Sequence, residues 1–184
     1  MLQDGQTDRG SVNEVARVGD TIRRPANRWT RSVHGLLRHL EAVGFDGAPR
    51  ALGFDDLGRE ILSFIPVEPA RRPWPAHLLE TDGVAKLARY LARYHEAVKS
   101  YVPPEDAEWH IPDLAWAPGM IIRHGDLGPW NSIWTGSTLN GLIDWDFAEP
   151  GNPLADVAQL ASRIVPLRGD DHWEKAGFST RPDM

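Results

Sequence analysis

The sequence predicts an α+β protein organised as two small lobes. Residues 1–65 contain short strand-like runs separated by turns, together with one amphipathic helix. Four prolines then fall within the ten residues from Pro66 to Pro75, where neither a strand nor a helix can continue. The residues that follow favour long helices. We therefore expect an antiparallel-sheet lobe over residues 1–65 and a mostly helical lobe over residues 66–184.

The composition excludes several classes of protein. The 184 residues are 41% hydrophobic and 25% charged, which is typical of a globular chain. A formal net charge of −6 does not suit a general nucleic-acid binder, and the absence of cysteine excludes disulfides and thiolate metal sites. The polar N-terminus is unlike a signal peptide, and no apolar run is long enough to span a bilayer. We expect a cytoplasmic protein with no nucleic-acid or membrane partner, and the oligomeric state stays open.

Local patterns predict the secondary structure of both lobes. Gly19-Asp20 separates two short strands, and Gly44 follows a run with helical spacing of apolar residues. A second long helix has His95 on its apolar face, and Asn152-Pro153 opens a third. The expected strands are 15–18, 21–24, 50–54, 60–65 and 119–122, and the expected helices are 32–43, 82–99 and one from 152 with Val157, Leu160, Ala161 and Ile164 inward.

One short segment, 121–146, gathers the residues best suited to chemistry. The polar residues 135–140 predict a turn, so Ser132 to Trp134 and Leu142-Ile143 should pair as a hairpin. That pairing would place Asn131 beside Asp144, and Asp126 lies on a loop that can curl back over the same point. Mg²⁺ prefers such carboxylate and amide oxygens. Asp126, if it is not a ligand, could accept a proton from an attacking hydroxyl during phosphoryl transfer.

The motifs of this segment resemble those of a known family. His124-Gly125-Asp126, four further residues and Asn131, and then Ile143-Asp144-Trp145-Asp146, are similar to the catalytic segment of the aminoglycoside phosphotransferase family. That family includes choline and homoserine kinases, and its bacterial members include trifolitoxin immunity domain proteins. The resemblance implies a two-lobed protein-kinase-like fold, shortened at both ends, that uses ATP and Mg²⁺ to phosphorylate a hydroxyl of a small molecule.

The resemblance also implies residue roles. Asp126 resembles the catalytic base, His124 the residue that braces the catalytic loop, and Asn131 and Asp144 the metal ligands. Asp156 resembles a buried supporting carboxylate, and Asp146 is a possible helper near the metal. The segment from Ser63 to Ile65 falls where the hinge between the lobes would contact adenine.

The first lobe departs from the kinase pattern. It contains no lysine, and the strand that should carry one ends in Arg23 and Arg24, which we assign to the nucleotide. The helix has Val33-His34 where a glutamate is expected, and only Gly10-Ser11-Val12 could cover a phosphate. A non-catalytic binding or immunity protein on a kinase scaffold is therefore an alternative. A metal-dependent hydrolase using His124, Asp126, Asp144 and Asp146 is a weaker one, because the other histidines lack ligand spacing.

Overall fold

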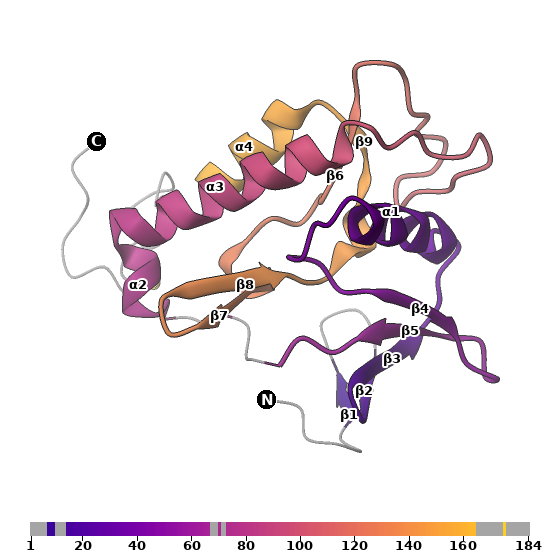
Figure 1. Ribbon diagram of the computed structural model, residues 1–184, viewed down its shortest axis with the longest axis horizontal. Helices are drawn as coiled ribbons and strands as arrows, with labels where there is room; N and C mark the ends of the chain where they lie inside the picture. The colour runs from indigo at the N-terminus through magenta and orange to yellow at the C-terminus, as the bar shows by residue number, and fades with distance from the viewer. Residues whose placement is uncertain (1–6, 10–13, 67–69, 71–72, 165–174, 176–184) are drawn as a thin grey trace.

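The computed structural model describes residues 7–9, 14–66, 70, 73–164 and 175. Its first part is an antiparallel sheet in the order β1-β2-β3-β5-β4, with one helix between β3 and β4. Figure 1 shows this sheet on one side of the molecule and the long helices on the other. The bounds are β1 Thr7–Arg9, β2 Glu14–Val18, β3 Thr21–Pro25, α1 Thr30–Ala42, β4 Ala51–Phe54 and β5 Arg59–Ser63.

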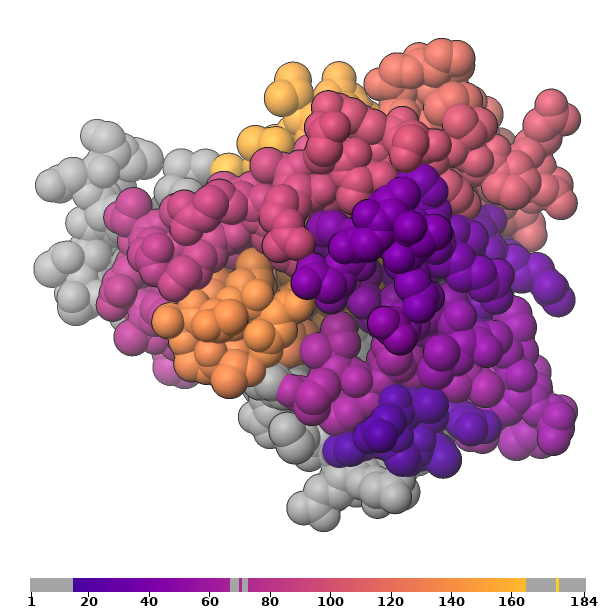
Figure 2. All heavy atoms as spheres, viewed as in Figure 1, coloured from indigo at the N-terminus to yellow at the C-terminus, as the bar shows by residue number. Residues whose placement is uncertain are grey.

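The second part combines helices with two small two-stranded sheets. Strand β6 pairs with β9, and β7 pairs with β8, each antiparallel. Figure 2 shows the surface of the β7–β8 hairpin, in orange, against that of α3. The bounds are α2 Ala76–Leu79, α3 Thr81–Val98, β6 Ile121–Arg123, η1 Pro129–Asn131, β7 Ser132–Thr135, β8 Thr138–Leu142, η2 Trp145–Phe147, β9 Glu149–Gly151 and α4 Pro153–Ile164.

Helix α1 joins the sheet to the helical part. It contacts β4, α3 and η2, and its buried leucines belong to one apolar cluster that continues through α3, β6 and η2. Tyr94 of α3 is fully buried in this cluster, and its hydroxyl donates to the carbonyl of Ile122 at 2.5 Å. Segment 121–146 is thus anchored to the same core as the sheet. No helix in the described ranges is long and apolar enough to cross a membrane.

The structure confirms the main elements expected from the sequence and corrects several details. The β7–β8 hairpin forms, but its turn is only Gly136-Ser137, so the strands are longer than expected. The short helix α2 and the strands β1 and β9 were not expected. On α4, Val157 is 48% exposed rather than inward. His95, on the apolar face of α3, is partly buried, and its ring nitrogen has a partner, because it lies 3.2 Å from a carboxylate oxygen of Asp156.

Candidate active site

The loop 124–131 begins with a turn that only glycine can make. Gly125 has a φ of +80°, a conformation that side-chain-bearing residues rarely adopt. A Cβ atom at this position would lie 1.8 Å from the carbonyl oxygen of Phe147. Glycine therefore allows the loop to approach the backbone that follows Asp144 and Asp146, and this approach brings the two halves of the motif together.

Asn131 fixes the carboxylate of Asp126. Its Nδ2 atom donates to the main-chain oxygen and to Oδ2 of Asp126, both at 2.9 Å. Trp130 Nε1 donates to the same Oδ2 at 3.1 Å, while Oδ1 of Asp126 accepts no hydrogen bond from any described residue. Because both amide hydrogens point at Asp126, the Oδ1 atom of Asn131 faces elsewhere and keeps its lone pairs for another partner.

His124 is a brace rather than a proton carrier. Its Nε2 lies 3.1 Å from the carbonyl oxygen of Ile143, so this nitrogen carries the proton and donates. Its Nδ1 accepts from the main-chain N–H of Asp126 at 3.3 Å. Burial lowers the pKa of the imidazole, although the nearby carboxylates of Asp156, Asp144 and Asp126 oppose this. A neutral ring therefore ties Asp126 to the residue before Asp144.

Helix α4 supports the loop with two polar side chains. Asp156 is fully buried, and its Oδ2 accepts from the main-chain N–H of His124 at 3.3 Å and lies 3.2 Å from Nε2 of His95. Gln159, three residues later on the same face, accepts from the N–H of Leu127 at 2.7 Å and donates to the oxygen of Gly125 at 2.8 Å. The supporting position predicted for Asp156 is thus what the structure shows, and Gln159 was missed.

Asp144 has a geometry suited to a cation. The hairpin places it directly after Ile143, whose N–H donates to the main-chain oxygen of Asn131 at 2.9 Å. Asp144 has a φ of +62°, and its side chain is 39% exposed. Only its Oδ1 has a partner among the described residues, Arg24, so Oδ2 can accept a ligand. These oxygens and the Oδ1 of Asn131 are the donor types that Mg²⁺ takes, and they fit it.

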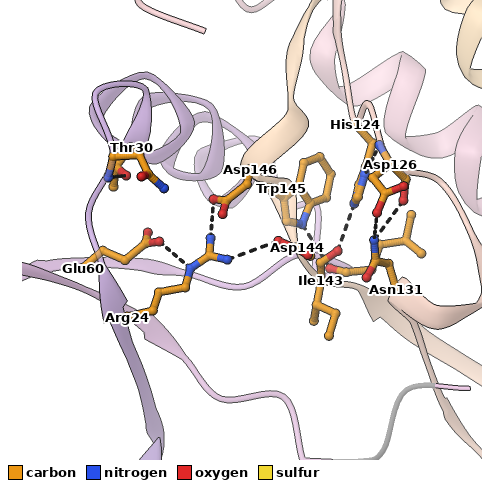
Figure 3. A network of polar contacts seen from close by, with 12 residues as sticks. Arg24, Thr30, Glu60, His124, Asp126, Asn131, Ile143, Asp144, Trp145 and Asp146 are labelled. Carbon is orange, nitrogen blue, oxygen red and sulfur yellow. Dashed lines mark hydrogen bonds and ion pairs between the residues drawn. The ribbon is translucent and has the colours of Figure 1, made fainter. Parts of the chain in front are cut away.

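Strand β3 places one buried cationic side chain, that of Arg24, next to three carboxylates (Figure 3). The guanidinium of Arg24 donates from Nε to Glu60 at 2.5 Å, from one terminal nitrogen to Asp144 at 3.2 Å and from the other to Asp146 at 2.6 Å. Burial lowers the pKa of Arg24, but the three carboxylates outweigh it and the net direction is upward. Burial raises the pKa of Asp146 to about 6, although Arg24 opposes it. The cluster thus contains one guanidinium and three carboxyl groups, so its acidic groups outnumber its basic group.

The other predicted nucleotide contacts are placed differently. Arg23 lies outside this cluster, because successive strand residues face opposite sides of a sheet, and it pairs with Asp55 at 3.3 Å. Ser63 ends β5, where its N–H donates to the carbonyl of Arg50 and its hydroxyl accepts from the N–H of Arg50. Ile65 lies just beyond, half-buried and without a main-chain hydrogen bond to any residue the structure describes. The expected turn at 10–12 lies outside the described residues.

The structure does not support the hydrolase alternative. Both ring nitrogens of His124 are already bonded, which leaves no lone pair for a metal. Within the described ranges, no group of three His, Cys, Asp or Glu side chains is arranged to hold a metal ion. Glu60, which accepts from Arg24, and His34, which bonds to Glu60, were not predicted as site residues. The only sequence signal for them was a charged residue in an apolar strand and a histidine in an apolar helix face.

Comparison with known proteins finds a family whose model matches part of this chain. The model of the phosphotransferase enzyme family matches residues 105–180, which include the whole of segment 121–146. The trifolitoxin immunity protein of Rhizobium leguminosarum bv. trifolii is 36% identical over 182 residues, covering 93% of this chain and 66% of that protein. The chain therefore resembles the phosphotransferase enzyme family over this segment. It spans slightly less than two thirds of the length of the curated relative.

Comparison with solved structures shows that the chain has the fold of small-molecule kinases. An amicoumacin kinase in complex with AMP-PNP and Ca²⁺ superposes with a TM-score of 0.68, at 12% identity over 92% of this chain and 68% of that one. A choline/ethanolamine kinase family protein from Mesorhizobium loti gives 0.57, at 17% identity over 87% of this chain and 64% of that one. The GDP complex of an aminoglycoside 2'-phosphotransferase gives 0.59, at 17% identity over 86% and 70%. The predicted family resemblance and fold class are confirmed.

Proposed function

We propose that the protein transfers the γ-phosphate of ATP to a hydroxyl of a small molecule. The observation that carries this proposal is the state of Asp126. Two side-chain donors hold its Oδ2, and its Oδ1 accepts no hydrogen bond from the described residues. A carboxylate fixed in this way, beside a cation-binding aspartate, is what an in-line phosphoryl transfer needs from a base.

Each residue then has a defined part in the reaction. Asp126 accepts the proton of the substrate hydroxyl while the substrate oxygen forms its bond to the γ-phosphorus and the bond to the β–γ bridging oxygen breaks. ADP leaves, and the proton stays on Asp126 until solvent removes it. Asp144 and Asn131 would hold Mg²⁺, which supplies neutralisation of phosphate charge. Arg24 adds a fixed positive charge beside the same phosphates, and Ile65 offers main-chain groups to adenine.

A second function competes with catalysis. The guanidinium of Arg24 already bonds both Asp144 and Asp146, and the chain is 36% identical to a protein named for toxin immunity. These two observations favour a protein that binds a ligand on the kinase scaffold without turnover. The net charge of −6 suits a cationic ligand in either case.

Binding and turnover assays separate the two functions. Thermal shift is measured with ATP alone, Mg²⁺ alone and both, and ADP release is then measured against a panel of aminoglycosides, amino alcohols and other hydroxylated metabolites. Acceptor-dependent ADP release that disappears in Asp126→Asn supports the phosphotransferase. Nucleotide binding with no ADP release above the Asp126→Asn background supports the non-catalytic binder. Failure to bind ATP, both with and without Mg²⁺, overturns the phosphotransferase.

A further inference from the structure

Arg24 is held from behind by a buried acid on the neighbouring strand. Arg24 of β3 and Glu60 of β5 are direct partners in the antiparallel register, and Nε and Oε1 lie 2.5 Å apart. Glu60 is 1% exposed, and both of its oxygens are used, because Oε2 accepts from His34 Nε2 at 3.0 Å. A buried carboxylate with both oxygens bonded has one favoured orientation, so it fixes the cation that it binds.

His34 connects this acid to helix α1. The ring is 1% exposed and stacks on Phe54 of β4, with centroids 4.9 Å apart and planes 29° apart. The helix thus contributes a hydrogen-bond donor, and the sheet contributes both the cation and the acid. The chain therefore has an ion pair of its own at the position where the sequence shows neither a strand lysine nor a helix glutamate.

The contact with Glu60 also sets the direction in which the two terminal nitrogens of Arg24 point. Arginine has many rotamers, so ordering a free arginine side chain costs conformational entropy. With Nε bound to Glu60, the planar group is turned so that both terminal nitrogens face Asp144 and Asp146 (Figure 3). Each terminal nitrogen carries two hydrogens, so donors remain for a phosphate that enters between them and the cation.

We propose that Glu60 and His34 are positioning residues that hold Arg24 ready for the phosphates of Mg²⁺-bound nucleotide. This inference rests on the proposed use of nucleotide at the site. The expected change in nucleotide affinity is opposite in sign to the change that charge alone predicts. Glu60→Gln removes a negative charge beside an anionic ligand, so long-range electrostatics alone would strengthen nucleotide binding. If Glu60 positions Arg24, the same substitution weakens binding.

The test is calorimetric titration of the full chain with Mg²⁺·AMP-PNP. We expect Glu60→Gln to raise the Kd about tenfold, the value of one charge-assisted hydrogen bond. In an Arg24→Gln background, Glu60→Gln should cause no further loss, because it acts through Arg24. Asp55→Asn is the matched control, since it removes the partner of the neighbouring Arg23 in the same sheet and should leave the Kd within twofold of wild type.

A second pair of variants covers the case in which Glu60→Gln does not fold. His34→Leu removes the donor to Glu60 and should raise the Kd about threefold, whereas His34→Gln keeps a donor and should restore most of the affinity. Unchanged or tighter binding in folded Glu60→Gln, or in His34→Leu, overturns the positioning role while leaving the proposed function intact. A wild-type protein that does not bind Mg²⁺·AMP-PNP overturns the proposed nucleotide site, and this inference with it.

Discussion

The side-chain amide of Asn131 donates to both the main-chain oxygen and the carboxylate of Asp126, so one residue sets the position of the other. This contact spans only five residues. It leaves one carboxylate oxygen of Asp126 and the amide oxygen of Asn131 for other partners, which in the proposed reaction are a substrate hydroxyl and a cation. The division of roles between Asp126 and the cation site can be tested directly.

Asp126→Asn and Asp144→Asn should impair the protein in different ways. If Asp126 is the base, Asp126→Asn should leave nucleotide affinity nearly unchanged and lower turnover by roughly two to four powers of ten. If Asp144 binds the cation, Asp144→Asn should weaken Mg²⁺·nucleotide binding as well as turnover. Calorimetry and ADP release measure the two effects. Equal loss of nucleotide affinity in both variants would show that Asp126 is a metal ligand instead.

The sequence predicted this part of the site because the contacts are local. A hairpin fixes the separation of the residues at its two ends, so the sequence predicted Asn131 beside Asp144. The N–H of Ile143, the residue before Asp144, donates to the main-chain oxygen of Asn131, as that hairpin requires. The joint binding of one cation by Asn131 and Asp144 stays a prediction. The exact turn, Gly136-Ser137, could not be predicted, since the register shift in the hairpin depends on packing.

The contacts of Arg24 could not be predicted in the same way. Glu60 is 36 residues away from Arg24 and Asp144 is 120 residues away, so their meeting depends on strand register and on how the sheet packs against the hairpin.

The prediction of which residues of α4 face inward was also partly wrong. Apolar spacing predicted Val157 as buried, but Asp156 and Gln159 face inward instead, because the loop presents unpaired backbone groups that only polar side chains can satisfy.

The stability of the protein without metal should fall as pH rises from about 4 to 6. Burial raises the pKa of Asp146 from 3.8 to about 6 in the folded state, so the folded protein keeps a proton that the unfolded chain releases. The difference corresponds to roughly 3 kcal/mol, lost through this window and constant above it. Urea unfolding in EDTA at several pH values should show a smaller decline for Asp146→Asn. An identical pH profile in the variant would contradict this origin.

The contribution of His124 to folding stability should change with pH in the opposite direction. Burial lowers its pKa, so below about pH 6.5 the unfolded chain takes up a proton that the folded protein does not, and stability is lost as pH falls. Nitrogen NMR of the imidazole should show the Nε2–H tautomer, persisting below pH 6.5. His124→Gln should remove this slope in the unfolding series. Detection of the doubly protonated ring at pH 6.5 in the folded protein would contradict the bracing geometry.

Gly125→Ala should destabilise the protein by several kcal/mol and abolish turnover. Alanine is strained at a φ of +80°, by about 1–2 kcal/mol, and its Cβ would also meet the carbonyl of Phe147. Gly58→Ala is the matched control, because its φ is +74° with nothing within 4 Å of the added carbon. Unfolding measurements on both variants separate strain from collision. Similar losses in the two would mean that the loop can move away from Phe147.

Trp130→Phe should lower turnover while leaving nucleotide affinity unchanged. The indole N–H is one of the two side-chain donors to Oδ2 of Asp126, and the ring is kept in place by Arg163, 5.0 Å from its centroid, and by Trp74 at 6.3 Å. Phenylalanine preserves an aromatic ring but removes the donor, so the carboxylate gains freedom to rotate.

A three- to tenfold fall in kcat is expected for Trp130→Phe, roughly the value of one hydrogen bond. Trp116→Phe provides the control, because its indole N–H also donates to an oxygen, that of Met120 at 3.1 Å, outside the site. In an Asp126→Asn background, Trp130→Phe should have no further effect on residual turnover, since it acts through the carboxylate. An additive loss there would show that Trp130 serves the fold or the acceptor directly, and not the orientation of Asp126.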